Sequence, residues 1–284
     1  NAMSGSALID AGDDASVPGG LTEDANGNAR IVGAAVDIGA TEAAPEADSL
    51  IVTIADDTVD AFDNETSLRE AVTFANSNAD ASTITFDAGL TGMTLTLTGG
   101  QLTLTEETTV DGDVNADDAA DVTISGGDSS RIFFVDPGVT ATLNSLALTG
   151  GSYSGKGGAI YAHFGSTLTI ADTTLSGNYS YGGGAIYGYG AALTITDSLL
   201  TGNMAAGDNG GAIHARYGTA SLTNTTVHGN TADSLGGGVF SFQASVSLVN
   251  STVTGNQAAL TGGSATYGGG LAGDNVLCWE ASAY

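Results

Sequence analysis

The chain has 284 residues, with 32 acidic and five basic side chains and a formal net charge of −27. Because nucleic-acid binding needs a basic footprint, this charge argues against nucleic acid as a partner, and against anionic membranes unless divalent cations intervene. The single cysteine, Cys278, excludes an internal disulfide. No apolar run approaches the roughly 20 residues that span a bilayer, so we expect no direct membrane insertion by this chain.

The first 49 residues differ in pattern from the rest of the chain. Residues 1–3, Asn-Ala-Met, are typical of a cloning remnant. Residues 4–44 carry aspartates among short turns without a repeat, and residues 43–49 have the composition of a linker. Residues 4–49 are therefore interpreted as an arm plus linker. We expect the arm to pack against the rest of the chain, a neighbouring module or a neighbouring molecule.

One amphipathic helix is predicted at residues 67–76, after a strand at 50–54. Ser67 and Glu70 have the spacing of a capping box. The apolar face of the helix consists of Leu68, Ala71, Val72 and Ala75. If the following residues stack as strands, the first coil would leave its core and edge open. We expect this helix to cover that end of a strand stack occupying residues 50–284.

Short strands separated by turns are predicted after the helix, because apolar residues alternate with Thr and Ser in each segment. These segments are residues 83–86, 94–97, 101–104, 108–110, 122–124, 132–135 and 140–148.

One pattern then recurs four times between Gly157 and Asn256: Gly-Gly, two apolar residues, a turn, an alternating strand and Gly-Asn. The asparagines that close the four copies stand 25, 27 and 26 residues apart. A unit of this length cannot bury its own apolar face and must stack on its neighbours. Three short strands per unit predict an all-β fold, a right-handed parallel β-helix of roughly nine coils.

Two sets of residues resemble known bacterial surface proteins. Residues 66–71, Thr-Ser-Leu-Arg-Glu-Ala, are similar to the N-terminal motif of β-helix surface proteins of the C-S-L-R-E-A type, with Thr66 in place of the cysteine. The Gly-Gly-Ala-Ile and Gly-Asn repeats resemble those of polymorphic outer membrane proteins. The phenylalanine of that family's F-x-x-N motif is replaced by Leu175, Leu200, Val227 and Val253.

Residues 8–42 resemble the segment that closes a module of the same kind. Together these resemblances imply an extracellular or cell-surface location, associated with the outer membrane, in a tandem-repeat protein.

Stacking in register would place equivalent residues of successive coils in columns. We interpret two columns as structural ladders, in which amides bond the coils above and below at a turn. They are Asp172, Asp197, Asn224 and Asn250, and Asn178, Asn203, Asn230 and Asn256. Two ionised carboxylates at Asp172 and Asp197 would repel each other. We expect them to turn outward into solvent, the alternatives being a bound cation or a raised pKa.

Another pair of columns follows the Gly-Gly pairs. If Ile160 and its equivalents point inward, alternation exposes the next residue and the one two further on. Such an exposed stripe would stack against sugar rings or present anchor residues to a protein partner. The alternative is stacking between coils that only stabilises the sheet, or cover by another part of the chain. The stripe comprises Tyr161, His163, Tyr187, Tyr189, His214, Arg216, Phe240 and Phe242.

A polysaccharide lyase or hydrolase is the enzymatic alternative. His214 with Arg216 is the one pairing of a base and a cation on a regular coil, beside Tyr187, Tyr189 and His163. No pair of acidic residues converges on the predicted face, as glycoside hydrolysis would require. We therefore predict no catalytic residues.

Calcium is the one cofactor that the sequence raises. Asp111, Asp113, Asn115 and Asp117 offer side-chain oxygens at every second position of one loop. The loop lacks the bidentate Glu and the Gly placement of an EF-hand, and a polar turn has the same composition.

The sequence predicts a non-enzymatic surface or secreted β-helix module for adhesion or extracellular contact. Its expected partner is a glycan or a host or cell-surface protein, with glycan binding along the stripe as the more specific hypothesis. The alternatives are the polysaccharide-degrading enzyme and an inert structural spacer of a tandem-repeat surface protein.

Overall fold

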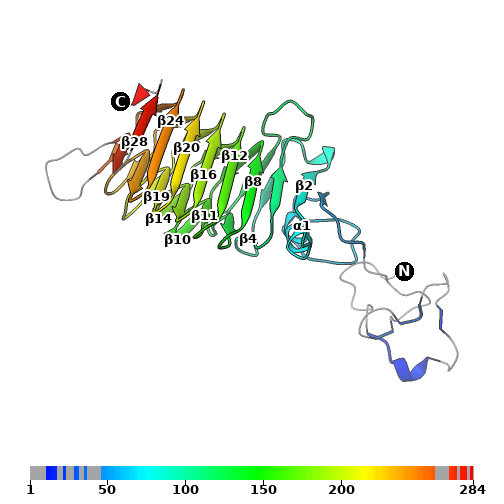
Figure 1. Ribbon diagram of the computed structural model, residues 1–284. Coiled ribbons are helices and arrows are strands. Elements are labelled where there is room, and N and C mark those ends of the chain that lie inside the picture. Colours follow the sequence, from blue (N-terminus) through cyan, green and yellow to red (C-terminus); the bar gives the residue numbers. More distant parts are fainter. Residues whose placement is uncertain are drawn as a thin grey trace.

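The computed structural model describes residues 11–17, 22–23, 29–31, 35–36, 46–259, 269–273, 276–279 and 282–283. From Ile51 onward the chain winds as a solenoid whose strands form four sheets along its length (Figure 1). Strands one coil apart pair in parallel and in register, as Leu168 with Leu193 shows. The predicted all-β parallel β-helix is confirmed, while its right hand stays a prediction from the chirality of parallel crossovers.

Each coil contributes one strand to most of the four sheets. The nine-stranded sheet contains β1 (Ile51–Val52), β2 (Ser82–Phe86), β5 (Thr108–Asp111), β8 (Thr140–Asn144), β12 (Thr167–Ala171), β16 (Ala192–Thr196), β20 (Thr219–Thr223), β24 (Ser245–Val249) and β28 (Val276–Trp279). The eight-stranded sheet contains β3 (Thr94–Thr96), β6 (Val122–Ser125), β9 (Leu146–Thr149), β13 (Thr174–Ser176), β17 (Leu199–Thr201), β21 (Thr226–His228), β25 (Thr252–Thr254) and β29 (Ser282–Ala283).

Two further sheets complete the coil. The seven-stranded sheet contains β4 (Leu102–Leu104), β7 (Phe133–Val135), β11 (Ile160–Ala162), β15 (Ile186–Tyr189), β19 (Ile213–Arg216), β23 (Val239–Phe242) and β27 (Leu271–Gly273). The five-stranded sheet contains β10 (Ser152–Lys156), β14 (Tyr179–Gly182), β18 (Met204–Ala205), β22 (Thr231–Ala232) and β26 (Gln257–Ala258).

The described strands make about seven turns rather than the roughly nine expected. The expectation assumed one uniform period over residues 50–284. Two stretches do not follow that period: residues 53–81 form the segment around the cap helix, and residues 112–121 form an acidic loop between β5 and β6.

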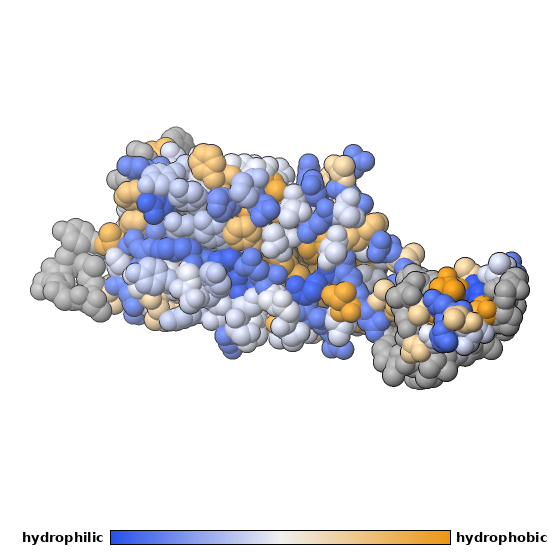
Figure 2. Space-filling model, turned by 90° about the horizontal axis from the view of Figure 1, so that it is seen from below, coloured by the Kyte–Doolittle hydropathy of each residue, from blue (hydrophilic) through white to orange (hydrophobic). Residues whose placement is uncertain are grey.

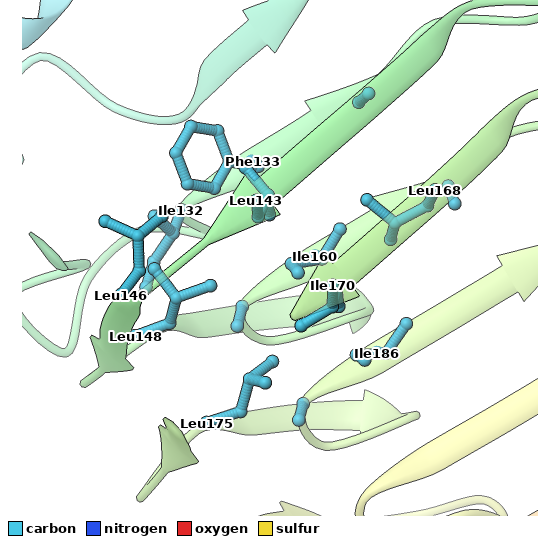
Figure 3. Packing of buried hydrophobic residues seen from close by; sticks show 14 of the residues in the cluster. Ile132, Phe133, Leu143, Leu146, Leu148, Ile160, Leu168, Ile170, Leu175 and Ile186 are labelled. Carbon is cyan, nitrogen blue, oxygen red and sulfur yellow. The ribbon is translucent and has the colours of Figure 1, made fainter. Parts of the chain in front are cut away.

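The core lies inside the coil and repeats from turn to turn. In β12, Leu168 and Ile170 are fully buried, whereas Thr167 is exposed and Thr169 half-buried. The same alternation in neighbouring coils brings Leu143, Ile160 and Ile186 to the interior (Figure 3). Because each inward residue lies on its counterpart one coil away, the apolar face of every repeat is buried by its neighbours.

The predicted helix is present as α1 (Leu68–Ala75), at the end of the stack beside β2 (Figure 1). Ser67 and Glu70 form the capping box. The helix packs against β1, β2 and β4, and its buried residues are Leu68, Ala71, Val72 and Ala75. It therefore covers the first coil as expected.

A partly buried ion pair fixes this helix to the second coil. The Nε of Arg69 lies 2.8 Å from one carboxylate oxygen of Asp57, whose other oxygen accepts hydrogen bonds from the Thr98 and Gly99 amides. Burial acts to raise the pKa of Asp57, but the hydrogen bonds from Arg69, Gly99 and Thr98 outweigh it and lower the pKa.

Only parts of the predicted arm fall within the described residues. The 3-10 helix η1 (Asp14–Ser16) lies beside Val36: the Gly12 amide just before the helix donates to the Val36 carbonyl, and the Asp14 carboxylate accepts from the Val36 amide. A second 3-10 helix, η2 (Ala88–Leu90), belongs to the solenoid. Within the linker, Glu46 donates its amide to Ala61 beside the cap segment. The arm's expected packing on a module or a second molecule stays a prediction, and residues 1–3 lie outside the described residues.

Among the described residues, none of the helices has the length and apolar character needed to cross a membrane.

Residues of like polarity line up along the stack, because equivalent positions of successive coils are superposed. Figure 2 shows the result on one face, where a hydrophilic band runs lengthwise over the coils.

Candidate functional site

The stripe residues lie in two columns on the seven-stranded sheet. The first, here the inner lane, contains Tyr161, Tyr187, His214 and Phe240, each paired with the next across the coils. Phe134 adds a rung below Tyr161. Sequence reasoning missed Phe134 because its coil has Ser130 and Arg131 at the positions where the later coils carry the Gly-Gly pair that marks the column.

Rings of the inner lane stack on one another. The ring centroids of Phe134 and Tyr161 are 5.2 Å apart and those of Tyr161 and Tyr187 are 5.3 Å apart, both pairs being stacked. His214 meets Tyr187 at 4.9 Å and Phe240 at 5.0 Å, edge to face. These are favourable arrangements for aromatic pairs.

The expected exposure is wrong for three of these residues. Tyr187, His214 and Phe240 are 3%, 4% and 7% exposed. Each ring covers its neighbour, and side chains of the adjoining strands and turns cover the lane from outside. The Nζ of Lys156 lies 5.5 Å from the Tyr187 ring centroid and 4.7 Å from that of Tyr181. Stacking and cover, which the sequence left open as an alternative, therefore describe the inner lane.

The second column, here the outer lane, remains accessible. It contains His163, Tyr189, Arg216 and Phe242, with Phe242 37% exposed and the others half-buried. Two exposed rings extend it: Phe164 lies 6.3 Å from Tyr189, and Tyr217 lies 5.7 Å from both Tyr189 and Phe242. Strand alternation could not find Tyr217, because it is a turn residue with a positive φ of 61°.

Three of the chain's five basic side chains lie on this aromatic face. Arg131 is buried over the Tyr153 ring and donates to the carbonyls of Gly157 and Lys156. Lys156 is paired with the carboxylate of Asp208. Arg216 lies 4.8 Å from the Tyr217 ring centroid.

Arg131 and Arg216 are the cations of this face with no carboxylate within 4.0 Å among the described residues, and of the two Arg131 is buried whereas Arg216 is half-exposed. Arg216 donates to the Tyr217 hydroxyl at 3.0 Å. That bond and one to Tyr187 raise its pKa, whereas burial lowers the pKa of Arg131. Burial also raises the pKa of Tyr161 and of Tyr187, so both phenols stay protonated at neutral pH.

A recess of about 310 Å³ opens where the two lanes meet the turn after β18. Its lining consists of Asp208, Asn209, His214, Arg216, Phe240 and Phe242. Asp208 is the one carboxylate in this lining, so the recess does not contain the pair of acidic residues that glycoside hydrolysis uses. Asn209 orients Asp208 by donating to its Oδ1 at 2.6 Å, and its own amide oxygen accepts from Leu235.

His214 lies at the back of this recess with neither ring nitrogen hydrogen-bonded. The Nδ1 atom is 3.9 Å from Asp208 Oδ2, beyond hydrogen-bond distance. Burial lowers the pKa of His214 to about 4, although Asp208 acts in the opposite direction. The imidazole is therefore neutral at physiological pH, with one nitrogen a donor and the other an acceptor.

The Gly-Asn column forms a buried ladder. From Asn203 onward, each Asn Oδ1 accepts from the backbone amide and the side-chain amide of the asparagine one coil earlier, as Asn203 does from Asn178 at 3.0 and 2.9 Å, whereas the Oδ1 of Asn178 accepts from the Gly151 amide. Each Nδ2 also donates to a core carbonyl, Leu175 in the case of Asn203. The positive φ at this turn belongs to the preceding glycine, 63° at Gly177 and Gly202, and not to the asparagine. The ladder comprises Asn178, Asn203, Asn230 and Asn256.

The other column, Asp172, Asp197, Asn224 and Asn250, does adopt positive φ, at 49°, 48°, 52° and 49°. Asn224 donates to Asp197 at 2.9 Å and Asn250 donates to Asn224 at 2.7 Å. Asp172 is half-buried and Asp197 is exposed, and both lie beside a shallow groove. Burial, followed by the neighbouring Asp197 charge, raises the pKa of Asp172.

A third ladder was not anticipated. Buried Ser and Thr hydroxyls accept from the amide one coil earlier, as Ser198 does from Thr173, and donate to a carbonyl of their own turn. Its members are Thr173, Ser198, Thr225 and Ser251. The mixture of Ser and Thr in ordinary strand surroundings gave no sequence signal.

The acidic loop gathers Asp113, Asp117 and Asp121, whose carboxylate oxygens lie within 4.8 Å of one another. Asp111 instead accepts from Asn144, and Asn115 donates to Asp121. Asp113 accepts from the amides of residues 116, 117 and 118, as in a polar turn. Calcium binding in this loop stays a prediction.

Residues 172–189 match the model of the Chlamydia polymorphic membrane protein repeat. The chain matches no curated protein and no solved structure. The matched segment runs from Asp172 through Leu175 and the ladder residue Asn178 to Tyr189 of the outer lane. The chain is thus a parallel β-solenoid of the kind that stacks short glycine- and asparagine-marked repeats. Those repeats are similar to the repeats of polymorphic membrane proteins, which indicates a surface or outer-membrane protein module.

Proposed function

We propose that this module mediates adhesion or extracellular contact, and that it binds glycan chains along the outer lane. The observation that carries the proposal is the line of rings Phe164, Tyr189, Tyr217 and Phe242, of which Tyr189 is half-buried and the other three are exposed, with neighbouring ring centroids 5.7 to 6.3 Å apart. Sugar rings present apolar C–H faces that pack on aromatic side chains, while flanking polar groups orient them.

Charge favours a neutral glycan over an acidic one. The chain carries −27 overall, so a polyuronate would be repelled over most of the surface. The outer lane itself contributes a guanidinium at Arg216 and an imidazole at His163, which suit hydroxyl groups. A cell-surface protein is the second partner class that aromatic and Arg residues suit.

The test is binding of the chain to a glycan array and to host cells, compared with the double variant Tyr189→Ser/Phe242→Ser. We expect the variant to bind at least about tenfold more weakly, as for loss of anchor residues. Tyr179→Ser is the control, because Tyr179 is an exposed ring, 45%, that lies away from the outer lane on the five-stranded sheet.

Two outcomes would overturn the proposal. Equal binding by the double variant and the parent chain would exclude the outer lane as the binding site. No binding to any glycan or cell would favour the alternative that the module is an inert structural spacer. Shortening of a polysaccharide during incubation with the chain would favour the enzyme.

A further inference from the structure

Buried polar atoms without partners are concentrated in the recess beside the outer lane. His214 is 4% exposed, and neither of its ring nitrogens has a hydrogen-bond partner. The Nε of Arg216 in the same lining is also buried and unpaired. Most buried polar side-chain atoms in proteins are hydrogen-bonded, so two such residues in one recess call for an explanation.

We infer that this recess is a subsite that binds a single neutral sugar residue through its hydroxyl groups. The inference rests on the proposed glycan binding and deepens it, because Arg216 and Phe242 belong to both the recess and the outer lane. A glycan chain lying on the outer lane would thus have one residue within reach of His214.

The mixture of donors and acceptors selects the ligand class. Arg216 can only donate, Asp208 as a carboxylate can only accept, and neutral His214 does both. A hydroxyl group also does both, so vicinal hydroxyls would satisfy all three side chains. A carboxylate ligand has no proton to donate to Asp208, and an ammonium ligand has no lone pair to accept a hydrogen bond from Arg216.

The carboxylate is already held in position for this role. Lys156 and Asn209 each donate to a different oxygen of Asp208, and each oxygen keeps a second lone pair for a hydroxyl. The Lys156 charge offsets that of Asp208, so the recess as a whole does not demand a cationic ligand.

Shape and apolar surface agree with one sugar residue. The rings of Phe240 and Phe242 line the recess next to the polar groups. Its volume of about 310 Å³ lies at the lower end of the roughly 300–1,000 Å³ typical of small-molecule sites.

The experiment records the imidazole resonances of the chain by NMR during titration with methyl glycosides. The chain has three histidines, of which exposed His228, on β21, is the internal control. We expect neutral glycosides such as methyl galactoside or methyl mannoside to shift the His214 resonances and leave those of His228 in place. Glucuronic acid, sialic acid and inorganic phosphate, added at the same concentrations, should not shift them.

The variant His214→Phe separates ring stacking from hydrogen bonding. It keeps an aromatic ring between Tyr187 and Phe240 and removes both nitrogens, so the solenoid should retain its thermal stability. We expect its affinity for the neutral glycoside to fall at least about tenfold.

The outcomes distinguish this inference from the proposed function. Glycan binding that His214→Phe leaves unchanged, or a His214 signal that no neutral glycoside moves, would overturn the subsite and leave outer-lane binding intact. A His214 shift caused by the acidic probes alone would reverse the ligand class. A neutral-glycoside shift without binding by the array would support the subsite and contradict the wider adhesion role.

Discussion

Single asparagines hold successive coils together, because each one satisfies backbone groups that no strand partner reaches. Replacing Asn203 by Ala would leave the buried amide of Asn178 and the carbonyl of Leu175 without their partners. At about 1–3 kcal/mol for each buried unpaired group, we expect a loss of about 3 kcal/mol or more. Urea denaturation monitored by circular dichroism measures it.

The exposed column supplies the matched control for Asn203. Asn224→Gly keeps a residue that tolerates the φ of 52° and removes only the solvent-exposed hydrogen bonds to Asp197 and Asn250. We expect a loss below about 1 kcal/mol. Equal losses in the two variants would mean that the buried ladder has no special role in stability.

The buried His214 makes stability depend on pH. Its folded-state pKa of about 4 lies below the unfolded value of 6.5, so the unfolded chain takes up the proton first. The contribution of neutral His214 to the free energy of unfolding is complete above pH 6.5. It falls by about 3 kcal/mol in all as the pH is lowered toward 4. The ionisable groups facing the ring are Asp208, Lys156, Arg216 and Tyr187. Denaturation midpoints at pH 7 and 4.5 should differ less in His214→Phe than in the parent chain.

At the scale of elements, the cap helix depends on one partly buried ion pair, Arg69 with Asp57. Asp57→Asn would weaken both bonds to Arg69 and the two amide contacts, and we expect local opening of α1, β1 and β2. Because solenoid repeats contact only their neighbours, β16 and β20 should keep their protection. Hydrogen exchange followed by mass spectrometry tests this.

Acidification should reproduce the effect of Asp57→Asn. The stabilisation from Asp57 is present above its unfolded pKa of about 4 and is lost as the pH falls through its lowered folded value. The control is Asp56→Asn at the exposed neighbouring position. Faster exchange spread evenly over all strands of Asp57→Asn would contradict local opening.

At the scale of the molecule, the sequence predicted what depends on repetition and missed what depends on irregular turns. The Gly-Gly and Gly-Asn marks were enough to place Tyr161, Tyr187 and His214 in one column. Alternation says on which face of a strand a residue lies, but not what covers that face. Lys156 and the turn that carries Asp208 cover Tyr187, and the lengths of such turns vary between coils. For the same reason the recess could not be predicted.

Repetition also predicts that one whole coil can be removed. Deleting residues 204–230 places Thr231 where Met204 was, and brings Leu193 onto Val246 and Asn203 onto Asn256. Since each new pair matches in kind, we expect a folded, less stable solenoid shorter by about 4.8 Å. Circular dichroism and small-angle X-ray scattering measure this. Deleting residues 204–217 instead shifts every later strand out of its column and should abolish folding. Equal behaviour of the two deletions would show that register between coils does not determine this fold.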